Sequence, residues 1–202
     1  MQDPRDITKG ILEKNRVRLN AMVDLIGRKE TIAFVGAGLS QPLGFPVWNK
    51  LLKELRNEAR TIDKNNEFRP TVRLTNKTAL KYADELQSFF RAHDQKLTLY
   101  REFLGNTFKR PATGEAFTDV QRTVVSLPFK TWVTTNFDVC LEDAFGCSAD
   151  TVVVQQDGGN AHTVSDCLLS LHESKRPSVI HIHGVHSQTE QIILSATDYA
   201  KA

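Results

Sequence analysis

The stretch Thr31-Ile32-Ala33-Phe34-Val35, followed at once by Gly36-Ala37-Gly38-Leu39-Ser40, decides the fold class of this chain. Four of the first five residues are apolar and three of the five are β-branched, which is typical of an interior strand of a parallel sheet. The glycines predict a turn, and apolar residues then recur at helical spacing from Trp48 to Ala59. Open α/β sheets bind ligands at the carboxyl ends of their strands, so this turn lies where a ligand is expected.

The rest of the chain alternates helical and extended patterns, which predicts an α/β fold built on a mostly parallel sheet. Pro46 is placed for the first turn of the helix after the glycine turn, and Pro128 closes a short helix. The expected helices include residues 7–28, 77–108 with a break near 93–94, and a segment from 197 onward. The expected strands cover residues 31–35, 129–134, 151–154, 178–183 and 192–194. We therefore expect a Rossmann-like sheet with flanking helices and a helical insertion.

The length and composition fit one domain with a substantial core, which we assign to residues 1–202. The sequence stops in the first turn of an expected helix, so we expect the full-length protein to continue beyond residue 202. The formal net charge of +2 is too small to indicate direct nucleic-acid binding. No apolar run is as long as a membrane span, and Cys140, Cys147 and Cys167 form no C-x-x-C pair. These features predict a cytoplasmic protein with reduced thiols and no membrane contact.

The glycine turn is a candidate phosphate-binding loop. Gly36 and Gly38 remove side chains where a backbone must approach a pyrophosphate closely, and N–H groups from Ala37 to Ser40 could donate to phosphate oxygens. The dehydrogenase fingerprint G-x-G-x-x-G has its third glycine where this chain has Gln41, which argues against a hydride-transferring dehydrogenase. The alternatives are a tight turn without a ligand and, for Ser40, a plain helix cap.

Two polar residues follow the expected strand at 129–134. The amide of Asn136 offers both a donor and an acceptor, which suits it to orient ribose hydroxyls or a water. An Asx turn is the competing interpretation, and the spacing favours neither. Asp138 could hold this loop in place or cap the helix that follows.

Histidines cluster at the end of the expected strand at 178–183. His183 precedes Gly184, and the usual histidine pKa of about 6.5 suits a general base at neutral pH. The H-x-H-x-x-H spacing of His181, His183 and His186 also raises a metal site. No nearby acid–histidine cluster completes a familiar one, so we expect no metal.

In their order along the chain, these segments resemble the sirtuin-like (silent information regulator) family. The resemblance extends from about Thr31 to Tyr199, and each matching segment lies at an expected strand end or in the loop after it. The matching segments are Gly36-Ala37-Gly38-Leu39-Ser40, Gly44-Phe45-Pro46, Thr134-Thr135-Asn136-Phe137-Asp138 and His183-Gly184.

Three departures separate the chain from sirtuins that deacylate proteins. Those enzymes carry Asp-Phe-Arg after the loop proline, where this chain has Val47-Trp48-Asn49. They tend to have Thr-Gln-Asn-Ile-Asp at the positions of residues 134–138, and they carry a four-cysteine zinc module that three scattered cysteines cannot build. The Gly-Phe-Pro-x-Trp loop and the segment from Leu194 to Tyr199 resemble instead the prokaryotic sirtuin-like branch, whose members cleave NAD in antiphage defence.

The resemblance implies a domain that hydrolyses NAD to nicotinamide and ADP-ribose. It makes Asn136 the residue that orients a water or the ribose hydroxyls, and His183 the general base. It places the glycine loop near the pyrophosphate and the Gly-Phe-Pro-x-Trp loop near the nicotinamide ribose, with Asp138 as supporting structure. The cofactor-binding residues that it implies are Gly36, Ala37, Gly38, Ser40, Phe45, Pro46, Trp48, Thr135 and Asp138.

The same resemblance implies an effector that depletes NAD in abortive infection. Such an effector acts as a homo-oligomer or with a defence partner, for example a helicase-like ATPase, an Argonaute-like protein or a phage trigger. Two other functions stay open, namely an NAD-dependent protein deacylase and a non-catalytic module that binds NAD or ADP-ribose. The cysteine count opposes the first, and the presence of both catalytic candidates opposes the second.

Overall fold

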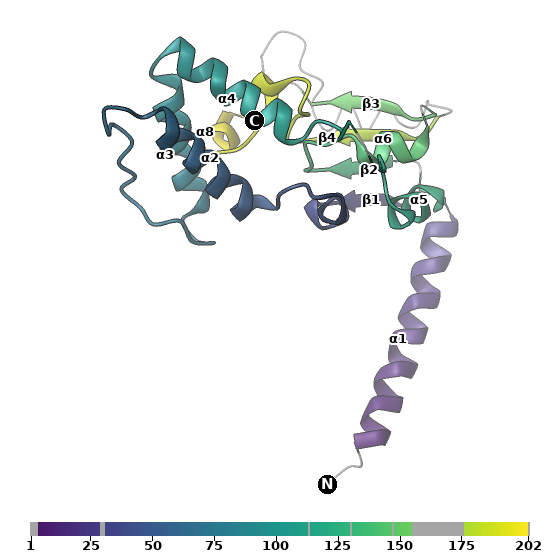
Figure 1. The fold of residues 1–202 in the computed structure, drawn as a ribbon. Coiled ribbons are helices and arrows are strands. Elements are labelled where there is room, and N and C mark those ends of the chain that lie inside the picture. The colour runs from purple at the N-terminus through teal and green to yellow at the C-terminus, as the bar shows by residue number, and fades with distance from the viewer. Residues whose placement is uncertain are drawn as a thin grey trace.

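A computed structural model describes residues 4–28, 31–112, 114–129, 131–146, 148–154 and 176–201 of the chain. Figure 1 shows strands that all point toward one side of the molecule, where helices α2 (Trp48–Ile62), α3 (Ala79–Arg91), α4 (Asp94–Thr107) and α8 (Ala196–Lys201) gather. We call these four helices the helical layer. Because the layer stands at the carboxyl ends of the strands, the residues that follow each strand lie between the sheet and the helices.

Among the described residues the sheet has four parallel strands in the order β1-β2-β4-β3, which confirms the expected α/β class. The strands are β1 (Ile32–Val35), β2 (Thr131–Thr134), β3 (Asp150–Val153) and β4 (Ser178–His181). Their register places Val35 beside Thr134, and Thr134 beside His181. The last residues of three strands therefore stand at one level.

Helices α5 (Asp119–Ser126) and α6 (Cys140–Phe145) pack beside the sheet. Val35, Trp132, Leu141 and Val179 form a buried cluster there, and the Trp132 ring meets the Phe145 ring edge-on at 4.8 Å between centroids. The start of α5 is fixed by a capping box, in which Thr118 and Gln121 bond each other's main-chain N–H groups.

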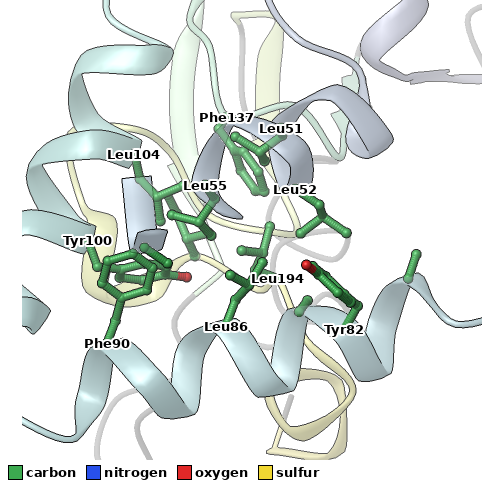
Figure 2. Close-up of a cluster of buried hydrophobic side chains, with 14 of the residues drawn as sticks. Leu51, Leu52, Leu55, Tyr82, Leu86, Phe90, Tyr100, Leu104, Phe137 and Leu194 are labelled. Atoms are coloured by element: carbon green, nitrogen blue, oxygen red, sulfur yellow. The ribbon is translucent and has the colours of Figure 1, made fainter. Parts of the chain in front are cut away.

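The helical layer has its own apolar core, drawn in Figure 2. The break near residues 93–94 divides one apolar segment into α3 and α4, as the sequence predicts, so that the two helices can fold against each other. Leucines of α2 meet aromatic and aliphatic side chains of α3 and α4. The labelled core residues are Leu51, Leu52, Leu55, Tyr82, Leu86, Phe90, Tyr100, Leu104, Phe137 and Leu194.

The structure corrects the expected position of the first strand. Within the described sheet β1 is an edge strand that pairs only with β2, and Ile32 and Phe34 are 49% and 68% exposed. An apolar run shows that a segment favours a sheet, but strand order depends on contacts with distant segments. The prediction of an interior strand was therefore wrong.

The expected strand at 192–194 is also wrong, because these residues form an irregular segment without a place in the described sheet. They are apolar because they are buried, with Ile192 and Leu194 in the core of the helical layer. Two boundaries shift as well. Strand β4 ends at His181 rather than at residue 183, and Pro46 lies two residues before α2 because Val47 has an extended conformation.

Helix α1 (Pro4–Gly27) confirms the expected N-terminal helix and extends away from the rest of the molecule in Figure 1. Its apolar side chains from residue 12 onward are mostly solvent-exposed; Leu12, Val17, Leu19, Met22, Val23 and Leu25 are each more than half exposed. In the described parts of the chain, no helix has both the length and the apolar composition needed to cross a bilayer.

The core of the helical layer is tested by Leu86→Ala. Leu86 is fully buried, so we expect the free energy of unfolding to fall by about 2–5 kcal/mol. Leu12→Ala is the matched control, because Leu12 is 64% exposed on α1 and its loss should change stability by less than about 0.5 kcal/mol. Urea denaturation followed by circular dichroism measures both, and equal midpoints would contradict the assigned core.

Candidate functional site

A pocket of about 240 Å³ opens between the carboxyl ends of the strands and the helical layer. It receives side chains from the loops after β1, β2 and β4, and from α2, α3 and α8. The residues that line it are Ala37, Ser40, Phe45, Pro46, Trp48, Leu51, Leu80, Phe108, Thr135, Asn136, Phe137, Asp138, His183 and Tyr199. All the predicted site residues except Gly36 and Gly38 are in this set.

Asn136 is held in the pocket by three hydrogen bonds. Its main-chain N–H donates to the Thr134 hydroxyl at 3.0 Å, and its side-chain Nδ2 donates to the Ser40 Oγ at 3.1 Å. Its main-chain carbonyl lies 2.9 Å from Nδ1 of His181. The remaining polar atom, Oδ1, is buried and has no partner among the described residues. An orphaned acceptor in a pocket wall is suited to a donor group of a ligand or a water.

Ser40 connects the glycine loop to the loop after β2. Its hydroxyl accepts from Asn136 and donates to Asp138 Oδ1 at 3.0 Å. The same carboxylate oxygen accepts the N–H of Cys140 at 3.2 Å, at the start of α6. Asp138 thus holds the loop and accepts from the first N–H of α6, but the N-cap residue of α6 is Val139, one residue later than the expected cap. The chain Asn136–Ser40–Asp138 fixes the orientation of the Asn136 amide.

The glycine loop folds as two short 3-10 turns, η1 (Ala37–Leu39) and η2 (Gln41–Leu43). The N–H groups of Leu39 and Ser40 donate to the carbonyls of Gly36 and Ala37. These two N–H groups therefore already have acceptors within the turn, so they are not free to bind a phosphate, contrary to the expectation from the sequence. Only the N–H groups of Ala37 and Gly38 precede the first bonded N–H of the turn.

His183 stands two residues beyond β4 and lines the pocket together with Ala37 and Ser40 of the glycine loop. Burial lowers the pKa of His183 below 6.5, so the imidazole is neutral at pH 7. The Tyr199 hydroxyl lies 3.2 Å from its Nε2, and the two rings meet edge to face at 5.1 Å. Tyr199 was missed as a site residue, although its segment was part of the resemblance. Burial raises its pKa, so the hydroxyl keeps its proton.

Asp198 anchors the helix that carries Tyr199. One of its carboxylate oxygens accepts from the N–H groups of Leu194 and Ser195 and from Gln87 Nε2, the last at 2.7 Å. The other accepts from Arg91 at 3.2 Å. These bonds lower the pKa of Asp198 despite its burial. They tie the start of α8, and with it Tyr199, to α3.

Aromatic residues form the apolar wall of the pocket. Phe45 stacks on Phe108 at 6.2 Å, and Phe108 meets Phe137 edge-on at 5.1 Å. Trp48 begins α2 at the same wall, and Pro46 is buried beside it. A pocket with an apolar wall on one side and a few polar groups on the other is typical of a small-molecule site.

His181, the last residue of β4, is fully buried. In addition to its contact with the Asn136 carbonyl, its Nε2 lies 2.7 Å from Glu142 Oε1 on α6. No sequence signal distinguishes Glu142, because an acidic residue early in a helix is ordinary. The spacing of His181, His183 and His186 raised a metal site, but both ring nitrogens of His181 have protein partners, as in a core histidine whose hydrogen bonds are satisfied.

No metal site is visible in the part of the chain that the structure describes, since no three His, Cys, Asp or Glu side chains converge there. Cys140 is a buried free thiol. Cys147 and Cys167 lie outside the described residues. The absence of a zinc module therefore stays a prediction.

Comparison with known families gives a match for the C-terminal part of the chain. The family model described as the SIR2-like domain matches residues 130–202. This confirms the sirtuin-like resemblance for that part of the chain, which contains Asn136, His183 and Tyr199 but not the glycine loop. None of the curated proteins compared with the chain matches it. A SIR2-like domain implies an NAD-related activity and NAD binding, without specifying the reaction.

Gly184 fixes the turn that presents His183. Its φ of +85° lies in the left-handed region, and a Cβ there would come 2.5 Å from the Gln191 carbonyl oxygen. We expect Gly184→Ala to lower stability by about 1–3 kcal/mol or more. In Gly27→Ala, the control, the added Cβ meets nothing within 4 Å at the end of α1, so stability should be kept. Thermal melting of both variants measures this, and equal melting temperatures would refute the assigned turn.

Proposed function

We propose that the pocket is the active site of an NAD glycohydrolase, which cleaves NAD to nicotinamide and ADP-ribose. The observation that carries the proposal is the meeting of Asn136 and His183 at one pocket, with an orphaned acceptor on the first and a neutral imidazole on the second. The match to a SIR2-like domain over residues 130–202 makes NAD the substrate of choice.

The substrate's size argues for a partial fit in the pocket. A volume of about 240 Å³ is slightly below the range of about 300–1,000 Å³ that is usual for small-molecule sites. The pocket would therefore take the nicotinamide ribose, and the rest of the dinucleotide would lie along the glycine loop. A Cβ at Gly36 or Gly38 would meet nothing within 4 Å, so packing gives no reason for glycine there. Close approach of a ligand would supply one.

The proposed reaction breaks the bond between the nicotinamide nitrogen and C1′ of the ribose. The bonding electrons pass to the pyridinium ring, which leaves as neutral nicotinamide and needs no acid. Water adds to C1′ of the oxocarbenium-like ribose and loses a proton. His183 would accept that proton, directly or through a ribose hydroxyl, because its imidazole is neutral at pH 7.

Asn136 would orient the water or a ribose hydroxyl through Oδ1. Its Nδ2 is bound to Ser40, whereas Oδ1 is buried and has no partner among the described residues. Phe45, Pro46 and Trp48 would shield the reacting centre from bulk water, and Thr135 and Asp138 would complete the polar wall. The aromatic wall would pack against the nicotinamide ring.

The biological role that we propose is depletion of NAD in response to phage infection. It rests on the resemblance of the Gly-Phe-Pro-x-Trp loop and the segment from Leu194 to Tyr199 to the prokaryotic sirtuin-like branch. The exposed apolar residues of α1 are available for a second copy or a defence partner. Measurement of cellular NAD after phage infection, with and without Asn136→Ala, tests this role.

Loss of either catalytic candidate should abolish most of the hydrolysis. We expect His183→Ala and Asn136→Ala each to lower the rate of nicotinamide release by about two to four orders of magnitude. His93→Ala is the control, because His93 is an exposed residue that precedes α4 and lies outside the pocket. Chromatographic assay of nicotinamide measures the rates. Full activity in both site variants, with intact melting curves, would refute the site.

The fall of activity at low pH should report the pKa of His183. A general base works when it is unprotonated, so activity should be constant around neutral pH and fall as the pH drops through the pKa of His183. Because burial lowers that pKa, the midpoint should lie below 6.5. Initial rates of NAD cleavage between about pH 4.5 and 8 test this. A midpoint above 7 would contradict a buried neutral base.

A further inference from the structure

His181 has an unusual hydrogen-bonding environment for a fully buried histidine. Both ring nitrogens face oxygen atoms, with Nδ1 at 2.9 Å from the Asn136 carbonyl and Nε2 at 2.7 Å from Glu142 Oε1. A carbonyl and an ionised carboxylate can only accept hydrogen bonds, and a neutral imidazole has only one N–H. The two contacts can form together only when the His181–Glu142 pair carries an extra proton.

Two features of the surroundings favour the imidazole as the site of that proton. Glu142 Oε1 also accepts a bond from the Thr151 hydroxyl at 3.3 Å, which favours an ionised carboxylate. Burial by itself lowers the pKa of His181, but the hydrogen bond and charge of Glu142 outweigh it and raise the pKa above its usual value. The Asn136 carbonyl and the Asp138 carboxylate act in the same direction.

The groups around His181 come from several elements. Glu142 lies on α6, Asp138 follows β2, and His186 follows β4, where charge on His181 lowers the pKa of His186. Its strand neighbours in the sheet, Thr134 on β2 and Val153 on β3, are uncharged. The charged group in direct contact with His181 is thus Glu142.

We infer that His181 is a positioning residue for the proposed hydrolysis: its imidazolium, held by Glu142, binds the main-chain carbonyl of Asn136 and so fixes the Asn136 side chain in the pocket. The inference rests on the proposed function. Asn136 lies between β2 and α6, where no helix or strand bonds fix its peptide. The anchors are instead side chains, namely Thr134 on the N–H, His181 on the carbonyl and Ser40 on the amide.

Two near-isosteric substitutions separate positioning from simple core filling. An asparagine side chain can place its amide nitrogen near the position of Nδ1, so His181→Asn can keep the bond to the Asn136 carbonyl. A glutamine side chain places its amide nitrogen near Nε2, so His181→Gln keeps a donor to Glu142 and loses the bond to Asn136. A merely structural role would make the two variants similar.

The kinetic test measures kcat and KM for NAD with the full chain. We expect His181→Gln to lower kcat about tenfold or more, with KM changed by less than about threefold, since small misplacement of a reacting group is costly. His181→Asn should recover most of that loss when combined with Glu142→Gln, which removes the unpaired charge. The inference would be overturned if wild type and His181→Gln had equal kcat values. It would also be overturned if His181→Gln and His181→Asn/Glu142→Gln lost kcat to the same extent.

A second measurement does not depend on catalysis. Nitrogen-15 NMR should find both ring nitrogens of His181 protonated at pH 7 in the wild-type chain and only one protonated in Glu142→Gln. The side-chain amide signals of Asn136 should shift in His181→Gln and stay near wild type in His181→Asn/Glu142→Gln. A singly protonated His181 in wild type, or unmoved Asn136 signals in His181→Gln, would overturn the inference. If the wild-type chain binds NAD but releases no nicotinamide, the proposed function fails, and these signals still decide the positioning role.

Discussion

The register of the parallel sheet is the constraint on which the site depends. Val35, Thr134 and His181 end their strands at one level, so the three loops that follow begin side by side. Ser40, Asn136 and His183 are far apart in the sequence, and this alignment brings them to one pocket. A shift of one residue in any pairing would turn alternate side chains to the opposite face and separate these groups.

Hydrogen bonds between the loops fix the orientation of the polar side chains that this alignment brings together. Ser40 joins the loop after β1 to the loop after β2, because its hydroxyl accepts from the Asn136 amide nitrogen and donates to Asp138. The Asp138 carboxylate accepts hydrogen bonds from the Ser40 hydroxyl and from the first N–H of α6. A loop with such bonds is preorganised, because its polar atoms already have the directions that a ligand requires.

Much of this site could be predicted from local patterns. Glycines after an apolar run, and polar residues just past later runs, mark strand ends in any parallel sheet, so Asn136 and His183 were accessible from sequence. Other features depend on contacts between distant segments. The edge position of β1, the irregular course of residues 192–194 and the partnership of His181 with Glu142 leave no local signature. The apolar residues at 192–194 pack in a core, and a buried strand would have the same composition, so the pattern does not distinguish the two.

Asp198 links the stability of the helical layer to the surroundings of the histidine. Its carboxylate binds Gln87 and Arg91 of α3, and the next residue, Tyr199, lies against His183. Asp198 and Tyr199 are neighbours on α8, so the bonds that hold α8 to α3 also keep the tyrosine beside the imidazole. The pocket needs both layers, because the loops after the strands supply some of its lining residues and the helical layer supplies others.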